Sequence, residues 1–321
     1  MAWRSLPPRT QGTSMLRYVV GRLLQAVLTL FLLSILIFLL ARVLGDPVAF
    51  MLPFDALPED IERITKMLGF DRPLYIQYVD FLGGALQGDL GQSTRQNVPV
   101  TELIADRWVA SAQLIGIAMA WAIAASLVLG ILAAVYRGSA LDAFVRTLAV
   151  IGQSAPPFWI GIILIQVFSV WLELLPSAGI GRLDHLVLPA FTMGLFGVAG
   201  MTRLLRSGML DVLDSEYVKK ARIMGVSERA VIWKHSLKNA CLPVLTFTGE
   251  YFGLLIAAGV VVETVFAWPG MGRLAYDAVF TRDYPLIQGV IMVIAMFVLF
   301  MNLAVDILYA YIDPRIRYER S

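Results

Sequence analysis

The chain has 321 residues, of which 58% are hydrophobic and 16% are charged, and its mean hydropathy is +0.73. Soluble globular proteins carry about 25% charged residues, so the composition excludes an ordinary cytosolic enzyme and indicates a polytopic α-helical membrane protein. A net charge of +2 gives no sign of a nucleic-acid partner, and one cysteine with two histidines argues against a disulfide or a metal centre.

The first apolar run covers residues 18–43 and predicts a membrane-spanning helix. The run is too long for the core of a signal peptide and lacks a small-residue cleavage pattern, so we expect the helix, bounded as 15–43, to be retained. Residues 1–14 are expected to form a cytoplasmic tail, and Met15 is an alternative start of the protein.

The segment 44–107 holds ten acidic and five basic residues and is expected to be a periplasmic loop. Within it, residues 58–68 predict a short amphipathic helix, because a proline opens it, acidic residues fill its first turn and a glycine follows it. The apolar face of Ile61, Ile64 and Leu68 allows two interpretations: a lid on the membrane domain, or a docking surface for an outside partner.

Five further apolar runs are each long enough for the roughly 20 residues that a bilayer crossing requires. They cover residues 112–136, 147–172, 186–205, 242–266 and 286–312. The sequence therefore predicts an all-α membrane protein of about six transmembrane helices, with a core transmembrane domain over 108–313 and a tail over 314–321. Three glycines at three-residue spacing, Gly194, Gly197 and Gly200, are expected to let a neighbouring helix approach closely.

The distribution of lysine and arginine favours one orientation. With the N-terminus inside, 17 of the 26 basic residues fall on the cytoplasmic side, whereas the opposite orientation leaves nine there. Because basic loops stay in the cytoplasm, we expect both termini to be cytoplasmic. The loop 207–241 then also lies in the cytoplasm.

This cytoplasmic loop predicts two short helices joined at a glycine. Asp214 or Ser215 can cap the first, Gly225 can end it in the left-handed conformation, and Ser227 can cap the second. On composition alone, the loop could equally be an amphipathic helix lying on the membrane surface.

The same loop carries a longer pattern, formed by Glu216-Tyr217-Val218, Ala221-Arg222, Gly225, His235, Asn239 and Leu242-Pro243. Other motifs accompany it along the chain: Gly45-Asp46-Pro47, Leu68-Gly69-Phe70-Asp71-Arg72-Pro73-Leu74, Gly88-Asp89-Leu90-Gly91, Pro156-Pro157-Phe158-Trp159, Glu263-Thr264-Val265-Phe266, Trp268-Pro269-Gly270-Met271-Gly272 and Asp313-Pro314-Arg315. Together they resemble the permease subunits of the dipeptide, oligopeptide and nickel branch of bacterial binding-protein-dependent ABC importers. The more general loop consensus of that superfamily is matched by Ala221 and Gly225.

The resemblance implies a type I ABC importer membrane-domain fold and a set of partners. These are a second, related permease, two ATP-binding subunits and an external substrate-binding protein, with ATP and magnesium on the partner subunits and no cofactor or chemistry in this chain. The loop is then a coupling helix that transmits ATPase movement, through Glu216, Tyr217, Ala221, Arg222, Gly225 and Val226. The residues nominated for contact with the binding protein are Asp71, Arg72, Trp268 and Gly270.

Four polar residues inside the predicted spans are candidates for the translocation path: Glu250, Gln153, Asn302 and Asp306. A carboxylate in the membrane is costly unless it has partners or water, so such residues are functional candidates by default. For Glu250 the alternative is an ion pair with a second subunit or with an arginine. For Asn302 and Asp306, four residues apart on one helix face, the alternative is helix packing.

Two other classes of protein were weighed against the importer. An ion-coupled secondary transporter is expected to show inverted repeats and broken helices, and no internal repeat is evident. An intramembrane enzyme lacks support because His185 and His235 fall on opposite sides of the membrane. Within the importer branch, di- or oligopeptide is the expected substrate, with nickel chelate, glutathione or sugar as alternatives.

Overall fold

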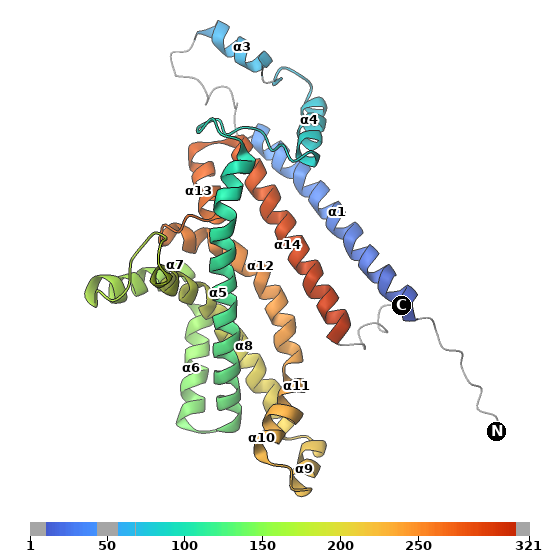
Figure 1. Ribbon diagram of the computed structural model, residues 1–321, viewed down its shortest axis with the longest axis vertical. Helices are drawn as coiled ribbons and strands as arrows, with labels where there is room; N and C mark the ends of the chain where they lie inside the picture. The colour runs from blue at the N-terminus through green and yellow to red at the C-terminus, as the bar shows by residue number, and fades with distance from the viewer. Residues whose placement is uncertain (1–10, 44–56, 68, 313–321) are drawn as a thin grey trace, which may run out of the picture.

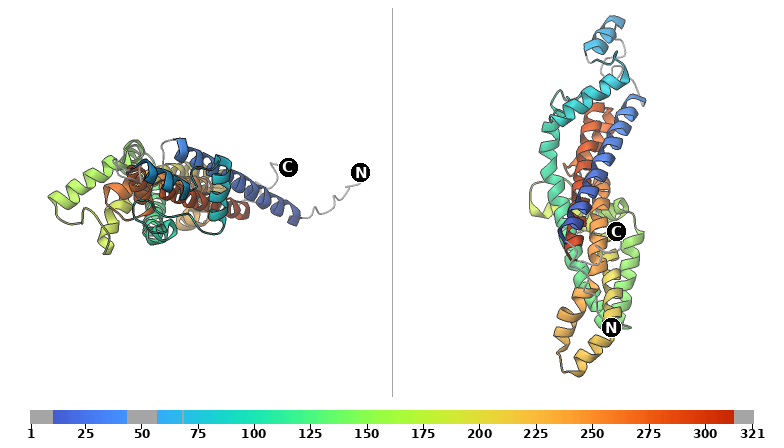
Figure 2. Two further views of the ribbon diagram at one scale, coloured as in Figure 1. Left: turned by 90° about the horizontal axis from the view of Figure 1, so that it is seen from above. Right: turned by 90° about the vertical axis from the view of Figure 1, so that its right-hand side faces the viewer.

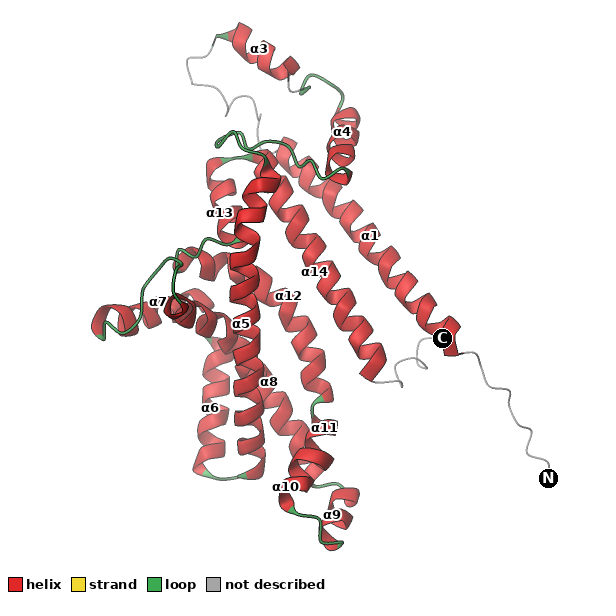
Figure 3. Cartoon of the chain, in the orientation of Figure 1, coloured by secondary structure: helices red, strands yellow, loops and turns green. Residues whose placement is uncertain are grey.

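A computed structural model describes residues 11–43, 57–67 and 69–312, apart from the side chains of residues 11–18, 43, 64, 306 and 308–312. Figure 3 shows these residues as helices joined by loops, and strand pairing among them is limited to an isolated bridge between Gln92 and Pro99. Five helices are long and apolar enough to cross a membrane, and a pair of helices bent by 110° makes six if the pair counts as one broken span. The expected all-α fold of about six spans is confirmed.

The long helices of the described residues are predominantly apolar, whereas the short helices α3 and α9 are rich in charged residues. In chain order they are α1 (Gln11–Val43), α3 (Pro58–Met67), α4 (Leu74–Leu86), α5 (Val100–Val135), α6 (Ala140–Ser154), α7 (Pro157–Leu164), the π-helical η1 (Ile165–Trp171), the 3₁₀-helical η2 (Leu183–Leu186), α8 (Val187–Leu213), α9 (Glu216–Ile223), α10 (Glu228–Ala230), the π-helical η3 (Val231–Ser236), α11 (Leu237–Ala240), α12 (Leu242–Val265), α13 (Met271–Thr281) and α14 (Tyr284–Ile312).

Several helices extend beyond the apolar runs that predicted them. α1 begins at Gln11, before Met15, and α5 begins at Val100, inside the segment expected as loop. α8 continues to Leu213, past the predicted end at residue 205. A hydropathy run marks the part of a helix that lies in lipid, while polar residues such as those at either end of these spans continue the helix outside it.

The predicted helix 147–172 is wrong as one continuous helix. α6 ends at Ser154, α7 begins at Pro157, and the two axes differ by 110°. Pro156 and Pro157 have no backbone N–H, and a proline drives the preceding residue into the extended region, where Ala155 lies with ψ of 129°. Figures 1 and 2 show the result: α6 stands beside α5, while α7 and η1 run sideways out of the bundle.

Glycines on α8 allow close packing against two neighbours. A Cβ added to Gly194 would overlap the indole of Trp121 on α5, and one added to Gly197 would overlap the ring of Tyr251 on α12. Gly200 faces α12 in the same way. The predicted close approach of neighbouring helices is confirmed, and α8 lies between α5 and α12 at the centre of the fold.

At the end of the bundle that carries α13, a buried carboxylate fixes a loop. Asp283 accepts hydrogen bonds from the Ser93 hydroxyl (2.5 Å), the Thr94 N–H (3.2 Å) and the Leu286 N–H (3.3 Å). The loop 92–99 and the first turn of α14 are therefore joined through one side chain.

The amphipathic helix predicted in the outer segment is present as α3. Ile61 and Met67 are exposed, and Figure 1 shows α3 beyond α4 and away from the membrane helices, so α3 is not a lid on the bundle of this chain. Leu68 and the side chain of Ile64 lie outside the described residues, as does the motif Gly45-Asp46-Pro47.

Candidate coupling and translocation sites

Residues 214–241, the coupling segment, form one end of the molecule. The segment consists of α9, α10, η3 and α11, and Figure 1 shows it projecting past the ends of α5 and α6. The sequence predicted two short helices joined at a glycine over 207–241. The first part of that range, through Leu213, belongs to α8 instead.

The first helix of the coupling segment begins without the predicted capping bond. Ser215 occupies the N-cap position of α9, but its side chain donates to the Val212 carbonyl (2.5 Å) rather than accepting from α9. The reason lies in the preceding helix, whose last carbonyls have no partner within α8 and compete for the hydroxyl.

Gly225 ends α9 in the left-handed conformation, as predicted. Its φ is +79°, its N–H donates to the Arg222 carbonyl (3.0 Å), and the Val226 N–H donates to the Ala221 carbonyl (3.1 Å). These two bonds define a Schellman motif. A Cβ at this position meets no atom of this chain within 4 Å, so the requirement for glycine comes from the backbone conformation.

Three residues of the sequence pattern join α9, which precedes the Gly225 turn, to η3 and α11, which follow it. The Tyr217 hydroxyl donates to the His235 carbonyl (3.2 Å), and the Asn239 amide donates to the Tyr217 hydroxyl (3.0 Å). Val218 of α9 and Val231 of η3 are both buried, and α9 packs against η3. The segment is thus a bend held by hydrogen bonds rather than a flexible loop, and we call it the elbow.

Two of the charged residues nominated for contact with an ATPase have partners within this chain. Arg222 forms two bonds to the Glu228 carboxylate (2.8 and 3.2 Å) across the Gly225 turn, and Glu216 pairs with Lys219 (2.9 Å). Surface ion pairs of this kind contribute little stability, so both charges remain able to exchange partners.

The most exposed apolar side chains of the segment sit at the turn itself. Ile223 and Met224 are 85% and 76% exposed, whereas the neighbouring Ala221 is buried. Large apolar side chains grouped at an exposed turn indicate a contact surface for another protein. The sequence analysis missed both residues, although their position directly before a helix-ending glycine was a usable signal.

The four residues nominated for the translocation path are not brought together. Glu250 on α12 and Asn302 on α14 are exposed, and within the described part of the chain neither forms a hydrogen bond or ion pair through its side chain. The side chain of Asp306 lies outside the description. Gln153, on α6, lines a cavity.

This cavity lies between α6 and α8 and has a volume of about 370 Å³. Beside Gln153, its walls include Arg146 from α6 and Thr202, Arg203 and Arg206 from α8. We call it the α6–α8 cavity. The sequence analysis counted these arginines for orientation and did not recognise that they converge.

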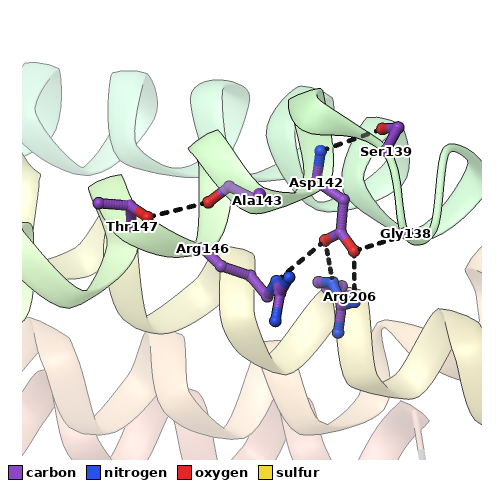
Figure 4. A network of polar contacts seen from close by, with 7 residues as sticks. All are labelled: Gly138, Ser139, Asp142, Ala143, Arg146, Thr147 and Arg206. Atoms are coloured by element: carbon purple, nitrogen blue, oxygen red, sulfur yellow. Dashed lines mark hydrogen bonds and ion pairs between the residues drawn. The ribbon is translucent and has the colours of Figure 1, made fainter.

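Two of the arginines that line this cavity belong to an ion-pair network, which Figure 4 shows. Buried Asp142 accepts two bonds from Arg206 (2.7 and 2.8 Å), lies 3.5 Å from Arg146, and accepts the Gly138 N–H (3.0 Å). Fork-to-fork pairing of this kind is strong and fixes the guanidinium. One carboxylate thus pairs with two of the three arginines that line the cavity.

The residues nominated for contact with a binding protein divide into two pairs. Asp71 and Arg72 are exposed, with Arg72 3.3 Å from Asp80. The nomination of Trp268 and Gly270 is wrong, because Trp268 is 1% exposed, its indole donates to the Ala110 carbonyl (2.9 Å), and Gly270 is buried as well.

No metal centre is evident: the described ranges bring together no group of three or more His, Cys, Asp or Glu side chains that could hold an ion.

On the exposed face of α3, the Lys66 ammonium 2.6 Å from Glu62 lowers the pKa of that carboxyl.

Comparison with known families matches nearly the whole chain. Residues 126–318 match the inner membrane component of binding-protein-dependent transport systems, and residues 15–115 match the N-terminal domain of such membrane components. The chain is 44% identical over 306 residues to the glutathione transport system permease protein GsiC of Escherichia coli (strain K12), covering 95% of this chain and 100% of the relative. The Shigella boydii counterpart is 43% identical with the same coverage.

Solved structures agree in fold. A chain of the MetNI methionine ABC transporter, solved in inward-facing conformations, superposes with a TM-score of 0.56 at 15% identity, covering 66% of this chain and 96% of that chain. A second crystal form of the same transporter gives a TM-score of 0.54.

Proposed function

We propose a substrate class and a coupling mechanism for this chain from one premise: it belongs to the family of inner membrane components of binding-protein-dependent transport systems. It is a multi-pass permease subunit of an ABC importer, in the branch that handles dipeptides, oligopeptides and nickel, with the type I membrane-domain fold. An ATPase and a substrate-binding protein are its general partners. Membership in this family decides against the ion-coupled secondary transporter.

For the substrate we favour glutathione or a short peptide of similar size and charge. The relatives at 43–44% identity are glutathione transport permeases, and glutathione is itself a tripeptide. This choice moves glutathione from an alternative to the favoured substrate, beside the expected di- or oligopeptide and ahead of nickel chelate and sugar.

For coupling we propose that the elbow formed by the coupling segment docks on an ATP-binding subunit. The observation that carries this proposal is the exposed pair Ile223 and Met224 at the left-handed Gly225 turn. The hydrogen bonds of Tyr217 make the elbow rigid, so movement of the ATPase passes to α8 and α12 as a rigid-body displacement. Glu216 and Arg222 supply exposed charges at its edge.

The assembly proposed here contains a second, related permease, two ATP-binding subunits and one external binding protein. ATP and magnesium are held by the ATP-binding subunits, and this chain performs no chemistry and holds no cofactor. Both termini and the coupling segment face the cytoplasm, in keeping with the excess of basic residues on that side. Exposed Asp71 and Arg72 remain candidates for contact with the binding protein, and Glu250, Asn302 and Asp306 for the path.

The test is reconstitution of the full complex in proteoliposomes, with ATP hydrolysis measured as glutathione-loaded or dipeptide-loaded binding protein is added. We expect stimulation by the glutathione-loaded protein. In the double variant Ile223→Ser, Met224→Ser, the ATP-binding subunits should no longer co-purify, while the permease inserts normally. The control Leu183→Ser removes a similarly exposed apolar side chain outside the coupling segment and should retain stimulation. Normal coupling in the double variant would overturn the docking assignment.

A further inference from the structure

The α6–α8 cavity carries an excess of positive charge inside the membrane domain. Arg146, Arg203 and Arg206 line it, and Asp142 is the one carboxylate that pairs with any of them within the described residues. Arg203 forms no ion pair with another described residue. Arg203 is exposed, and three guanidinium groups beside a single carboxylate give the cavity a positive potential that attracts anions.

Uncharged polar side chains also line the cavity. Gln153 from α6 and Ser207 from α8 belong to its wall. An amide or a hydroxyl can hydrogen-bond the oxygens of a bound ligand, so these residues can complement the charge that Arg203 supplies.

The faces of α6 separate this cavity from lipid. Leu141, Phe144, Leu148 and Ile151 are exposed and recur at three- and four-residue spacing, so they form one apolar face. Arg146 and Gln153 lie on a different face of the helix, toward α8. The apolar face suits lipid or another subunit, which leaves the arginine-lined face for an aqueous path.

The dimensions of the cavity suit a short peptide. Arg146 and Gln153 are seven residues apart on α6, which corresponds to roughly 10 Å along the helix. An extended tripeptide spans about the same length. The volume of about 370 Å³ lies within the usual range for small-molecule sites.

We propose that the α6–α8 cavity binds the carboxylates of an acidic peptide as it crosses the membrane domain, with Arg203 as the charged contact still open to a ligand. The proposal rests on the proposed function. It adds that the permease itself, and not the binding protein alone, selects the substrate. A lipid phosphate could present the same anionic oxygens to the same arginines. The experiment therefore separates these two sources.

The test uses the full complex with Cys241→Ser as parent, which removes the chain's single cysteine, and adds Gln153→Cys as a reporter in the cavity. Rates of modification are measured with an anionic and a cationic methanethiosulfonate reagent in phosphatidylcholine nanodiscs. We expect the anionic reagent to react about tenfold faster, because the arginines concentrate anions. Millimolar S-methylglutathione, which has both carboxylates but no free thiol, should slow the reaction.

Matched variants identify the charge responsible. Arg203→Gln should lower the ratio of anionic to cationic rates about threefold or more, and it should weaken protection by S-methylglutathione. Arg137→Gln removes an exposed arginine that pairs with Asp214 outside the cavity and should change neither.

Three results would overturn the proposal: no reaction of Gln153→Cys with either reagent, equal rates for the two reagents, or protection by added phosphatidylglycerol but not by S-methylglutathione. The last result would assign the cavity to a lipid headgroup. Stimulated ATP hydrolysis of the Cys241→Ser parent is measured separately, so loss of the importer function itself is recognised whatever the labelling shows.

Discussion

The Ser111 hydroxyl of α5 donates a hydrogen bond of 2.5 Å to the carboxylate of Glu263, near the end of α12. The other carboxylate oxygen accepts the Arg273 N–H (3.0 Å) in the first turn of α13. Glu263 is 1% exposed, and a Cβ at Gly270 would overlap its carboxylate. One side chain therefore joins three helices, and the crowding around it explains why Trp268 and Gly270 are buried.

We expect Glu263→Ala to destabilise the protein by about 2–5 kcal/mol, because it leaves two buried donors without an acceptor. Glu263→Gln keeps one carbonyl oxygen and should cost less. The measurement is thermal unfolding of the purified permease in detergent. Glu250→Ala removes an exposed carboxylate from the same helix and should leave the transition unchanged; equal effects of the two alanine variants would contradict the role assigned to Glu263.

Gly225→Asp should leave membrane insertion intact and abolish uptake. The substitution places a charged side chain at the exposed turn and forces a non-glycine residue to a φ of +79°, a conformation that costs about 1–2 kcal/mol. Uptake by cells and the amount of permease in the membrane fraction are both measured.

Gly138→Asp is the matched control for this turn. Gly138 has a φ of +80° and, like Gly225, has open space around its Cβ position, but it joins α5 to α6 instead of belonging to the coupling segment. We expect the Gly138 variant to retain most transport. If both variants lose uptake equally, strain rather than docking explains the loss.

Gly197→Ala should lower the thermal stability of the permease, because the new methyl group overlaps the ring of Tyr251 and pushes α8 away from α12. Gly116→Ala on α5, where nothing lies within 4 Å of the Cβ position, should be neutral or stabilising. Thermal unfolding of both variants in detergent tests the pair. A neutral Gly197 variant would refute the close contact described here.

The rate of Cys241 alkylation should rise at a higher pH than the rate for a free thiol. Burial raises the pKa of this thiol above its ordinary value, and the thiolate is the reactive form, so less thiolate is present at neutral pH than for a free cysteine. The rate of labelling with iodoacetamide, measured against glutathione from pH 7 to 10, should rise later for the protein. After denaturation the two profiles should coincide.

Hydropathy was sufficient to find the membrane helices, because a bilayer requires long apolar runs. It could not find the bend between α6 and α7, since both halves are apolar and the effect of Pro156 and Pro157 is on the backbone. The glycines of α8 were readable as packing residues because small side chains at regular spacing have few other uses in a membrane helix.

Some of the candidate functional residues could be predicted from the sequence. The Gly225 turn followed from local backbone chemistry, and Tyr217 and Asn239 were found as a pattern whose hydrogen bonds only the fold reveals. The α6–α8 cavity combines residues about 60 positions apart, which sequence periodicity cannot bring together. Trp268 was misassigned because an aromatic residue in a loop looks exposed until its burial is known.

The hydrogen bonds of Asp283 have a mechanical consequence. Since the same carboxylate holds Ser93 and the N-terminal turn of α14, we expect a force on the loop 92–99 to be transmitted to α14 rather than taken up by bending of the loop. A protein that bound this loop would then be linked mechanically to a helix long enough to cross the bilayer.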